Sequence, residues 1–231
     1  MASIGGSSKE VRMERLNQIV SEDKIISTRA YNLIMGGVVL YGLVVNAILC
    51  NFSTQLATTI NPIVLLIGYI VLMIVGSVIV RKSTSAIVSF LGYNLICVPL
   101  GVVIAVMVEF YGGVDSRPVQ MAFIYTIGIT LIMVLGAVAF PSLFEKLGKA
   151  LFIALIAIAI VGLISIFVPG LGGLYSILGA GLFSLYIGYD FYRSQQFAKA
   201  ADNAVDCAAD IYVDIAKLFM FLLRIFGRSN D

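Results

Sequence analysis

Histidine is absent from this chain of 231 residues, and only three cysteines are present. Without histidine, a Ser–His hydrolase, a HExxH metalloprotease and haem–His ligation are all excluded. Cys50, Cys97 and Cys207 lie far apart without CxxC spacing, so we interpret them as small apolar residues rather than as disulfides or metal ligands. No Gly-rich phosphate loop follows a strand, and a net charge of +2 argues against a nucleic-acid partner. We therefore expect that the protein binds no cofactor and is not an enzyme.

Charged side chains are also scarce, at 12% of residues, whereas 60% of residues are apolar. This balance lies far outside that of a soluble domain and predicts an all-α integral membrane protein. A helix needs about 20 residues to cross the hydrocarbon core. Seven stretches of that length are expected, at residues 31–50, 60–80, 86–111, 119–140, 150–168, 174–192 and 205–226.

The seven segments leave little chain for anything else. We expect an N-terminal tail at residues 1–30, a seven-helix transmembrane domain at 31–226 and a short C-terminal tail at 227–231. The first segment begins too late, and has no suitable cleavage site, for a removable signal peptide. It is therefore expected to stay in the membrane as a helix.

Basic residues predict the orientation, because cytoplasmic loops carry the excess of Lys and Arg. The first, third and fifth loops contain only Arg117. The N-terminal tail and the second, fourth and sixth loops contain Lys9, Arg12, Arg15, Lys24, Arg29, Arg81, Lys82, Lys146, Lys149, Arg193 and Lys199. The N-terminus is therefore expected in the cytoplasm and, after seven crossings, the C-terminus outside, although Arg224 and Arg228 oppose this placement.

Two aspartates lie in the last two segments, Asp190 in SLYIGYDFY and Asp214 in DIYVDIAKLF. A carboxylate at membrane depth is costly unless it is paired, protonated or hydrated, so such residues are candidates for function. Two carboxylates within hydrogen-bonding reach in a low-dielectric site share a proton and titrate as a unit. We therefore expect the activity at this pair.

The seventh segment has a charged stripe along one face of its helix. The stripe consists of Asp206, Asp210, Asp214, Lys217 and Arg224. Such a helix cannot face lipid on all sides, which predicts six helices packed around a central seventh. We interpret Asp206 and Asp210 as solvated residues near the positive helix N-terminus, whereas Asp214, about two turns further in, has no such explanation.

The segments FSLYIGYDFYRS and IYVDIAKLFMFLLRIFG resemble the signature of the transmembrane BAX inhibitor motif family. Asp190 and Asp214 match the paired aspartates of that family, and Leu222, Leu223 and Arg224 complete the second motif. The basic N-terminal tail and RKSTSAIVSF after the second helix also fit, so the resemblance covers the chain from about Ile26.

The resemblance implies six helices around a seventh, and a pH-sensitive calcium leak in which the two aspartates share a proton and control the pore. It also implies a basic latch at the end of the second helix, either Arg81 or Lys82, that binds Asp190. Two features depart from the family pattern: the second helix contains no acid, and Lys217 stands where Asn is common. Lys217 is expected to pair with Asp214 or Asp190, or else to face a hydrated cavity.

Calcium needs six to eight oxygen ligands, and two aspartates supply at most four. Asp190 and Asp214 are therefore expected to bind a calcium ion only transiently, with water and backbone carbonyls completing its coordination. Glu109 and Asp115 are candidates for attracting cations to an outer mouth, or else belong to a solvated loop.

Two other functions stay open. A pair of membrane aspartates also occurs in intramembrane aspartyl proteases, although here Asp214 follows Ile-Tyr-Val rather than Gly-x-Gly and no proline follows Pro169. The same fold also suits a regulator that binds a membrane protease or another membrane partner without transporting ions. With no visible retention signal or transit peptide, the expected location is a prokaryotic plasma membrane.

Overall fold

The structure is a computed structural model, and it describes residues 24–168 and 170–228. Residues Lys9, Arg12 and Arg15 of the expected tail, as well as Pro169, lie outside these ranges. Eight helices make up the described part of the chain, which contains no strand apart from an isolated bridge between Ile25 and Ala200. The expected all-helical class is confirmed.

The helices match the expected segments closely. They are α2 (Thr28–Cys50), α3 (Ser53–Thr59), α4 (Pro62–Lys82), α5 (Ala86–Phe110), α6 (Arg117–Ala139), α7 (Pro141–Phe167), α8 (Leu171–Ser194) and α9 (Ala201–Arg228). Proline at the first turn of α4, α6 and α7 costs no hydrogen bond, because the first N–H groups of a helix have no partner within it.

Two helices differ from expectation. α7 begins at Pro141, nine residues before the expected start, so Lys146 and Lys149 belong to a helix rather than to a loop. The short helix α3 was not predicted, because its sequence STQLATT has no apolar periodicity. Apart from these differences, the helix ends lie within about four residues of the expected positions, the precision to be expected of helix boundaries.

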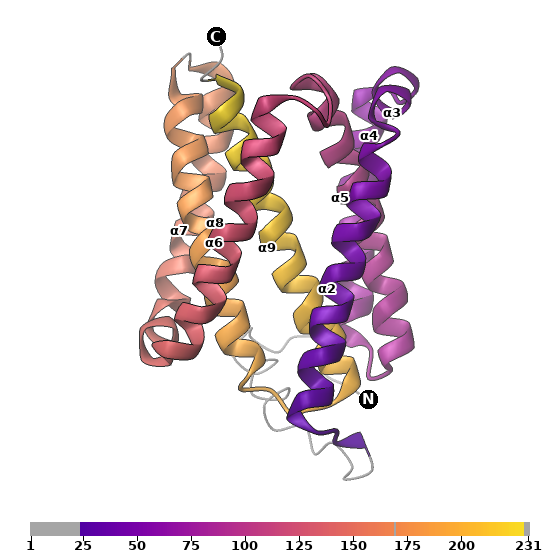
Figure 1. Cartoon of the computed structure of the whole chain (residues 1–231), viewed down its shortest axis with the longest axis vertical. Coiled ribbons are helices and arrows are strands. Elements are labelled where there is room, and N and C mark those ends of the chain that lie inside the picture. The colour runs from indigo at the N-terminus through magenta and orange to yellow at the C-terminus, as the bar shows by residue number, and fades with distance from the viewer. Residues whose placement is uncertain (1–23, 169, 229–231) are drawn as a thin grey trace.

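The helices form two groups on either side of α9 (Figure 1). In one group, α2, α3 and α4 pack against α5; in the other, α6 and α7 pack against α8 and each other. α9 packs against α2, α5, α6 and α8. The expected arrangement of six helices around a seventh is not confirmed, because α4 and α7 have their main contacts with α5 and α8.

The described helices differ in how much apolar surface they leave uncovered. Six of them, α2 and α4 to α8, are long and apolar enough to cross a membrane. α9 is not among these six, so the expected count of seven membrane-spanning helices is not confirmed either. More than half of the α9 side chains are buried, including Tyr212, Leu218 and Leu223, which are fully covered. α4, in contrast, buries only Gly76 and Val80.

Candidate functional site

α8 brings Asp190 to the last part of its length, and α9 brings Asp214 to the middle of its own. α8 lies between α7 and α9, and a side chain at Gly188 would collide with Phe144 of α7. Position 190 lies two residues, or about 200° around the helix axis, from position 188. Asp190 therefore points away from α7. The carboxyls of Asp190 and Asp214 lie within hydrogen-bonding reach of each other.

Both aspartates are nearly inaccessible, with 8% of Asp190 and 6% of Asp214 exposed. Each carboxyl has a buried oxygen, Asp190 Oδ1 and Asp214 Oδ2, that has no hydrogen-bond partner among the described residues. Two ionised carboxylates this close and this poorly solvated repel each other strongly, so the arrangement fits a pair that holds a proton. Asp214 Oδ2 and, beside its 3.6 Å ion pair with Arg193, Asp190 Oδ1 are acceptors that water or a hard cation would satisfy.

The pair faces a cavity of about 220 Å³ between α4, α8 and α9. Its wall combines apolar side chains such as Ile96 and Leu155 with Arg81, Asp210 and Lys217. Arg81 belongs to the last turn of α4, so the cavity lies at the end of the molecule where α4 and α8 finish. Within the described ranges, no three His, Cys, Asp or Glu side chains are grouped to hold a metal ion. A resident metal therefore has no cluster of ligands in this part of the chain.

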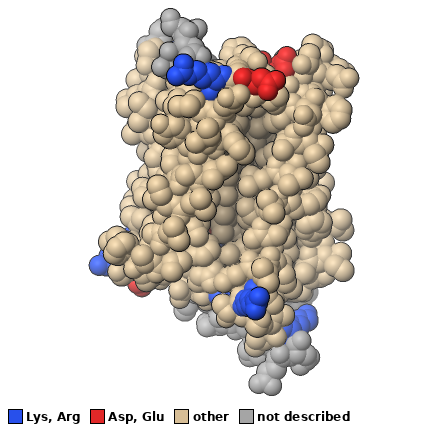
Figure 2. Space-filling model, in the orientation of Figure 1, with Lys and Arg blue, Asp and Glu red and all other residues tan. Residues whose placement is uncertain are grey.

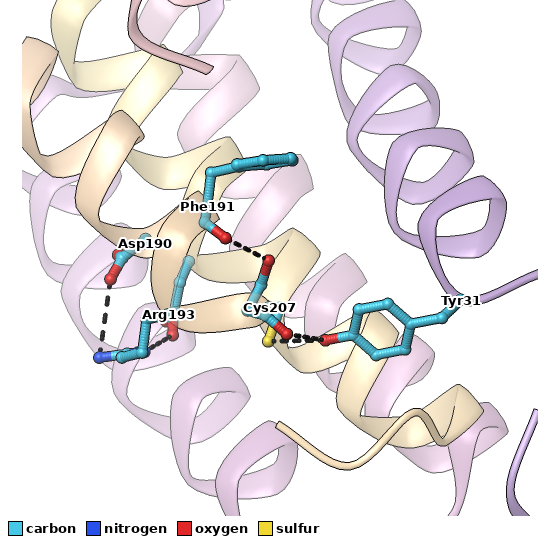
Figure 3. A network of polar contacts seen from close by, with 7 residues as sticks. Tyr31, Asp190, Phe191, Arg193 and Cys207 are labelled. Carbon is cyan, nitrogen blue, oxygen red and sulfur yellow. Dashed lines mark hydrogen bonds and ion pairs between the residues drawn. The ribbon is translucent and has the colours of Figure 1, made fainter. Parts of the chain in front are cut away.

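Arg193 is the cation closest to Asp190. Its Nη1 lies 3.6 Å from Asp190 Oδ1, and its Nη2 lies 2.7 Å from Asp210 Oδ2 (Figure 3 shows the Asp190 contact). Its guanidinium also lies 5.7 Å from the centre of the Phe197 ring. The sequence predicted Arg193 only as one of the basic loop residues, although its spacing of three residues from Asp190 is the spacing of neighbours on a helix.

Asp206 and Asp210 are not simply solvated helix-end residues. Asp206 is 5% exposed, and Asp210 forms the short ion pair with Arg193. The interpretation of Asp206 as a solvated residue is therefore wrong, whereas the Asp210 side chain is 33% exposed and pairs with Arg193 at the same time. The physical reason is that residues 203–209 near the start of α9 are all buried, so an acid among them needs partners inside the protein.

The two latch candidates differ in position. Arg81 lines the cavity and interacts electrostatically with Asp190. Lys82 is exposed and does not line the cavity. The basic residue at the end of α4 that faces the aspartate pair is thus Arg81.

Lys217 lies in the cavity wall, with its ammonium 4.9 Å from the centre of the Phe183 ring. In the part of the chain that the structure describes it forms no ion pair within 4 Å, yet it interacts electrostatically with Asp214. Lys217 therefore faces the aspartate pair without a direct salt bridge, and a cation–π contact stabilises its charge.

The outer-mouth candidates are at the opposite end of the bundle, where Figure 2 shows acidic and basic side chains side by side. Glu109 accepts hydrogen bonds from Ser53 Oγ at 2.7 Å and Thr54 Oγ1 at 3.1 Å, which tie α3 to α5. Asp115 is exposed in the loop before α6. The structure thus gives Glu109 a role in holding α3, whether or not it attracts cations.

A second polar cluster, partly drawn in Figure 3, connects the start of α2 to the end of α8 and the start of α9. Tyr31 is fully buried and donates a hydrogen bond to the Ser194 carbonyl at 3.0 Å, and its hydroxyl lies 3.4 Å from Cys207 Sγ. Lys199, in the α8–α9 connection, lies 4.5 Å from the centre of the Tyr31 ring, and desolvation lowers its pKa. The Cys207 thiol thus makes a polar contact with the Tyr31 hydroxyl, in addition to its expected role as a small apolar residue.

A layer of hydrogen-bonded residues connects α2, α5 and α9 through Tyr212, two residues before Asp214. Tyr212 donates its hydroxyl to Asn46 Oδ1 at 2.8 Å and also lies 3.2 Å from the Cys97 carbonyl. The Tyr93 ring meets Tyr212 edge to face at 5.4 Å. A side chain at Gly42 would collide with both tyrosines, so the absence of a Cβ lets α2 approach α5 and α9 closely.

Residues 23–231 match the model of the family described as inhibitor of apoptosis-promoting Bax1. The chain belongs to this family. Two relatives are Helicobacter pylori proteins named only as uncharacterized, 34% identical over 54% of this chain and 38% identical over 37% of it. The chain spans 56% and 37% of the length of these two relatives.

A third relative is a Streptococcus pyogenes protein named as an uncharacterized membrane protein. It is 28% identical over 170 residues, which is 70% of this chain and 72% of the relative. With six apolar helices of membrane-spanning length, this Bax inhibitor-like protein is an integral membrane protein in contact with the lipid bilayer.

Proposed function

We propose that this Bax inhibitor-like protein is a pH-sensitive calcium leak, in which Asp190 and Asp214 share a proton and control cation passage. The observation that carries the proposal is the approach of these two buried carboxyls across the α8–α9 contact, where both line the same cavity. A shared proton holds α8 against α9. Loss of that proton replaces the hydrogen bond by repulsion between two charges and frees oxygens for a cation.

In this proposal α9 is a seventh membrane crossing, surrounded by the other helices. Its 28 residues correspond to about 42 Å at 1.5 Å per residue, longer than the roughly 30 Å of hydrocarbon. Figure 1 shows α9 running along the same axis as its neighbours. Asp206 and Asp214 are covered by protein, as is required of charged residues inside a membrane, whereas Asp202 and Asp210 are partly exposed.

The orientation of the proposed channel follows the basic residues. Arg81, Lys82, Lys146 and Lys149 belong to the ends of α4 and α7 that lie on the same side as the start of α2. The positive-inside rule places this end in the cytoplasm, so the N-terminal tail of residues 1–30 would be cytoplasmic and the C-terminal residues 227–231 external. Glu109 and Asp115 would then lie at an outer mouth, in a prokaryotic plasma membrane.

The test is calcium flux into liposomes that contain only the purified chain and an enclosed calcium-sensitive dye, measured at a series of external pH values. The expected flux rises with pH over the neutral range, because deprotonation separates the pair. Asp190→Asn and Asp214→Asn should each remove this pH dependence. Asp202→Asn, a change to an acid of the first turn of α9 that does not line the cavity, is the matched control.

Unchanged pH dependence in both the Asp190→Asn and the Asp214→Asn variant would rule out a gating role for the two aspartates. Absence of flux from the pure chain would instead favour a non-transporting regulator of a membrane partner. Cleavage of a transmembrane peptide that depends on both aspartates would show an intramembrane protease.

A further inference from the structure

A crevice of about 530 Å³ lies on the other side of α9 from the aspartate cavity. Its walls are α2 and α6, and its floor is formed by Ile104 and Val108 of α5 together with Ile215, Ala216 and Phe219 of α9. α2 and α6 have at most marginal contact with each other, and Figure 2 shows a furrow along the same face. The volume lies within the range of about 300–1,000 Å³ that is typical of small-molecule sites.

The crevice opens sideways, toward lipid. The side chains at its edges, among them Val44 near the α2 wall and Phe123 and Leu131 on α6, are about half exposed or more. They lie in helices of membrane-spanning length. A hydrophobic molecule therefore reaches the crevice from within the bilayer, whereas a water-soluble ligand would have to cross apolar surface.

The length of the crevice matches one leaflet. On α6 its lining runs from Gln120 to Leu131, about 16 Å at 1.5 Å per residue. That is half of the roughly 30 Å hydrocarbon core. An acyl chain that starts at the membrane surface near Gln120 would end beside Leu131 in the middle of the bilayer.

The surface end of the crevice has the features of an anion site. The lining ends at Val119 and Gln120 in the first turn of α6. Ser116, the partly buried residue before this helix, makes no capping hydrogen bond, and its Oγ is covered without a hydrogen-bond partner in the described chain. Arg117 follows directly. Pro118 has no N–H, and the Gln120 N–H bonds to the Ser116 carbonyl at 3.1 Å. The N–H groups of Arg117 and Val119, together with the Arg117 guanidinium, would therefore hold a phosphate at this helix end. The nearby acids do not fill this position: Glu109 is bound by Ser53 and Thr54, and the Asp115 side chain is exposed.

We propose that the crevice binds one phospholipid of the adjacent leaflet, with an acyl chain between α2 and α6 and its phosphate at Arg117 and the N-terminus of α6. This site is separate from the proposed cation path, because it faces Ile215 and Phe219 rather than Asp214. The bound chain would fill the space between α2 and α6 and would cover the partly exposed Phe219 of α9.

The experiment uses the full chain in liposomes that contain a phosphatidylglycerol with a diazirine near the end of one acyl chain. After illumination, cross-linked peptides are mapped by mass spectrometry. Labelling of Ile215 or Phe219 on α9 is expected, since the lipid chain reaches the crevice floor. Labelling confined to outward-facing residues of the other helices would overturn the proposal.

Blocking variants make the test specific. Ala47→Phe and Ile127→Trp fill the crevice from its two walls, and each should lower α9 labelling by about tenfold, equivalent to about 1.4 kcal/mol. Ala159→Phe, at an exposed position of α7 outside the crevice, is the matched control and should leave labelling unchanged. Equal labelling in a folded blocking variant and in the control would contradict an acyl-chain site.

The phosphate contact is tested with a diazirine diacylglycerol of the same chain length and with Arg117→Gln. Both should reduce α9 labelling relative to phosphatidylglycerol and the parent chain. Lys146→Gln, the loss of an exposed cation at the other end of the bundle, is the control and should have no effect. If diacylglycerol labels α9 as well as phosphatidylglycerol does, and Arg117→Gln has no effect, the crevice binds hydrophobic chains without recognising phosphate and this part of the proposal fails.

Discussion

Arg193 forms a closer ion pair with Asp210 of the neighbouring helix, at 2.7 Å, than with Asp190 of its own helix, at 3.6 Å. One guanidinium thus connects α8 and α9 through Asp210 while it contacts the acid that also faces Asp214. The planar, multidentate guanidinium suits such a bridge better than an ammonium does. The charge state of the aspartate pair is therefore linked to the ion pair that holds the two helices together.

Arg193→Gln should weaken the α8–α9 contact and move the pH dependence of flux. Loss of the cation leaves Asp190 and Asp210 without their partner, which costs about 1–3 kcal/mol of folding free energy. It also favours the protonated pair, so the pH midpoint of flux should move upward. Thermal unfolding in detergent and liposome flux measure the two effects.

A double-mutant cycle separates the ion pair from other effects of these changes. Arg193→Gln and Asp210→Asn together should cost less than the sum of the single changes, because the same interaction is lost only once. Lys149→Gln, which removes an exposed cation of α7, is the control. Strict additivity of the two changes would argue against a functional bridge.

Arg81→Gln should raise calcium flux at a given pH, whereas Lys82→Gln should leave it unchanged. Arg81 and Lys82 are adjacent and carry the same charge. Of these two residues, only Arg81 lines the cavity and interacts with Asp190. Loss of its charge removes the attraction between the end of α4 and the end of α8. Equal flux from the two variants would show that Arg81 is not a latch.

Lys217→Asn should raise the pH midpoint of flux and strengthen the calcium response. The ammonium faces Asp214 and favours the ionised pair, and it competes with a cation for the same oxygens. Phe183→Leu should have a smaller effect in the same direction, because it removes the ring that positions the ammonium but keeps the charge. A midpoint and a calcium response equal to those of the parent would remove Lys217 from the mechanism.

Tyr212→Phe should lower stability by about 1–2 kcal/mol, because Asn46 and the Cys97 carbonyl lose their buried hydrogen-bond partner. Tyr41→Phe removes a hydrogen bond of similar length to Asn94, but at an exposed position, and should cost less. Unfolding temperatures of the two variants in the same detergent provide the comparison. A larger loss for Tyr41→Phe would contradict the importance of the buried layer.

The apolar segments predicted most of the helices because helix length in a membrane follows from hydrocarbon thickness. The start of α7 was missed since Glu145, Lys146 and Lys149 interrupt the apolar run. Motifs placed Asp190 and Asp214 in a common site, and the structure brings them together. The ion pair of Arg193 with Asp210 was not predicted, because it depends on how α8 and α9 face each other, which composition and spacing within one helix do not determine.

In the proposed channel, where α9 is the seventh crossing, the charges of α9 have a consequence for the order in which the helices enter the membrane. Each Asp or Lys at the centre of a helix costs about 2.5–3.5 kcal/mol to insert alone, and α9 contains Asp206, Asp210, Asp214 and Lys217. The helices that contact it, α2, α5, α6 and α8, all precede it in the chain and are apolar enough to insert independently. Synthesis therefore completes the partners first, and α9 leaves the ribosome when a protein surface that accepts its acids is already in the bilayer.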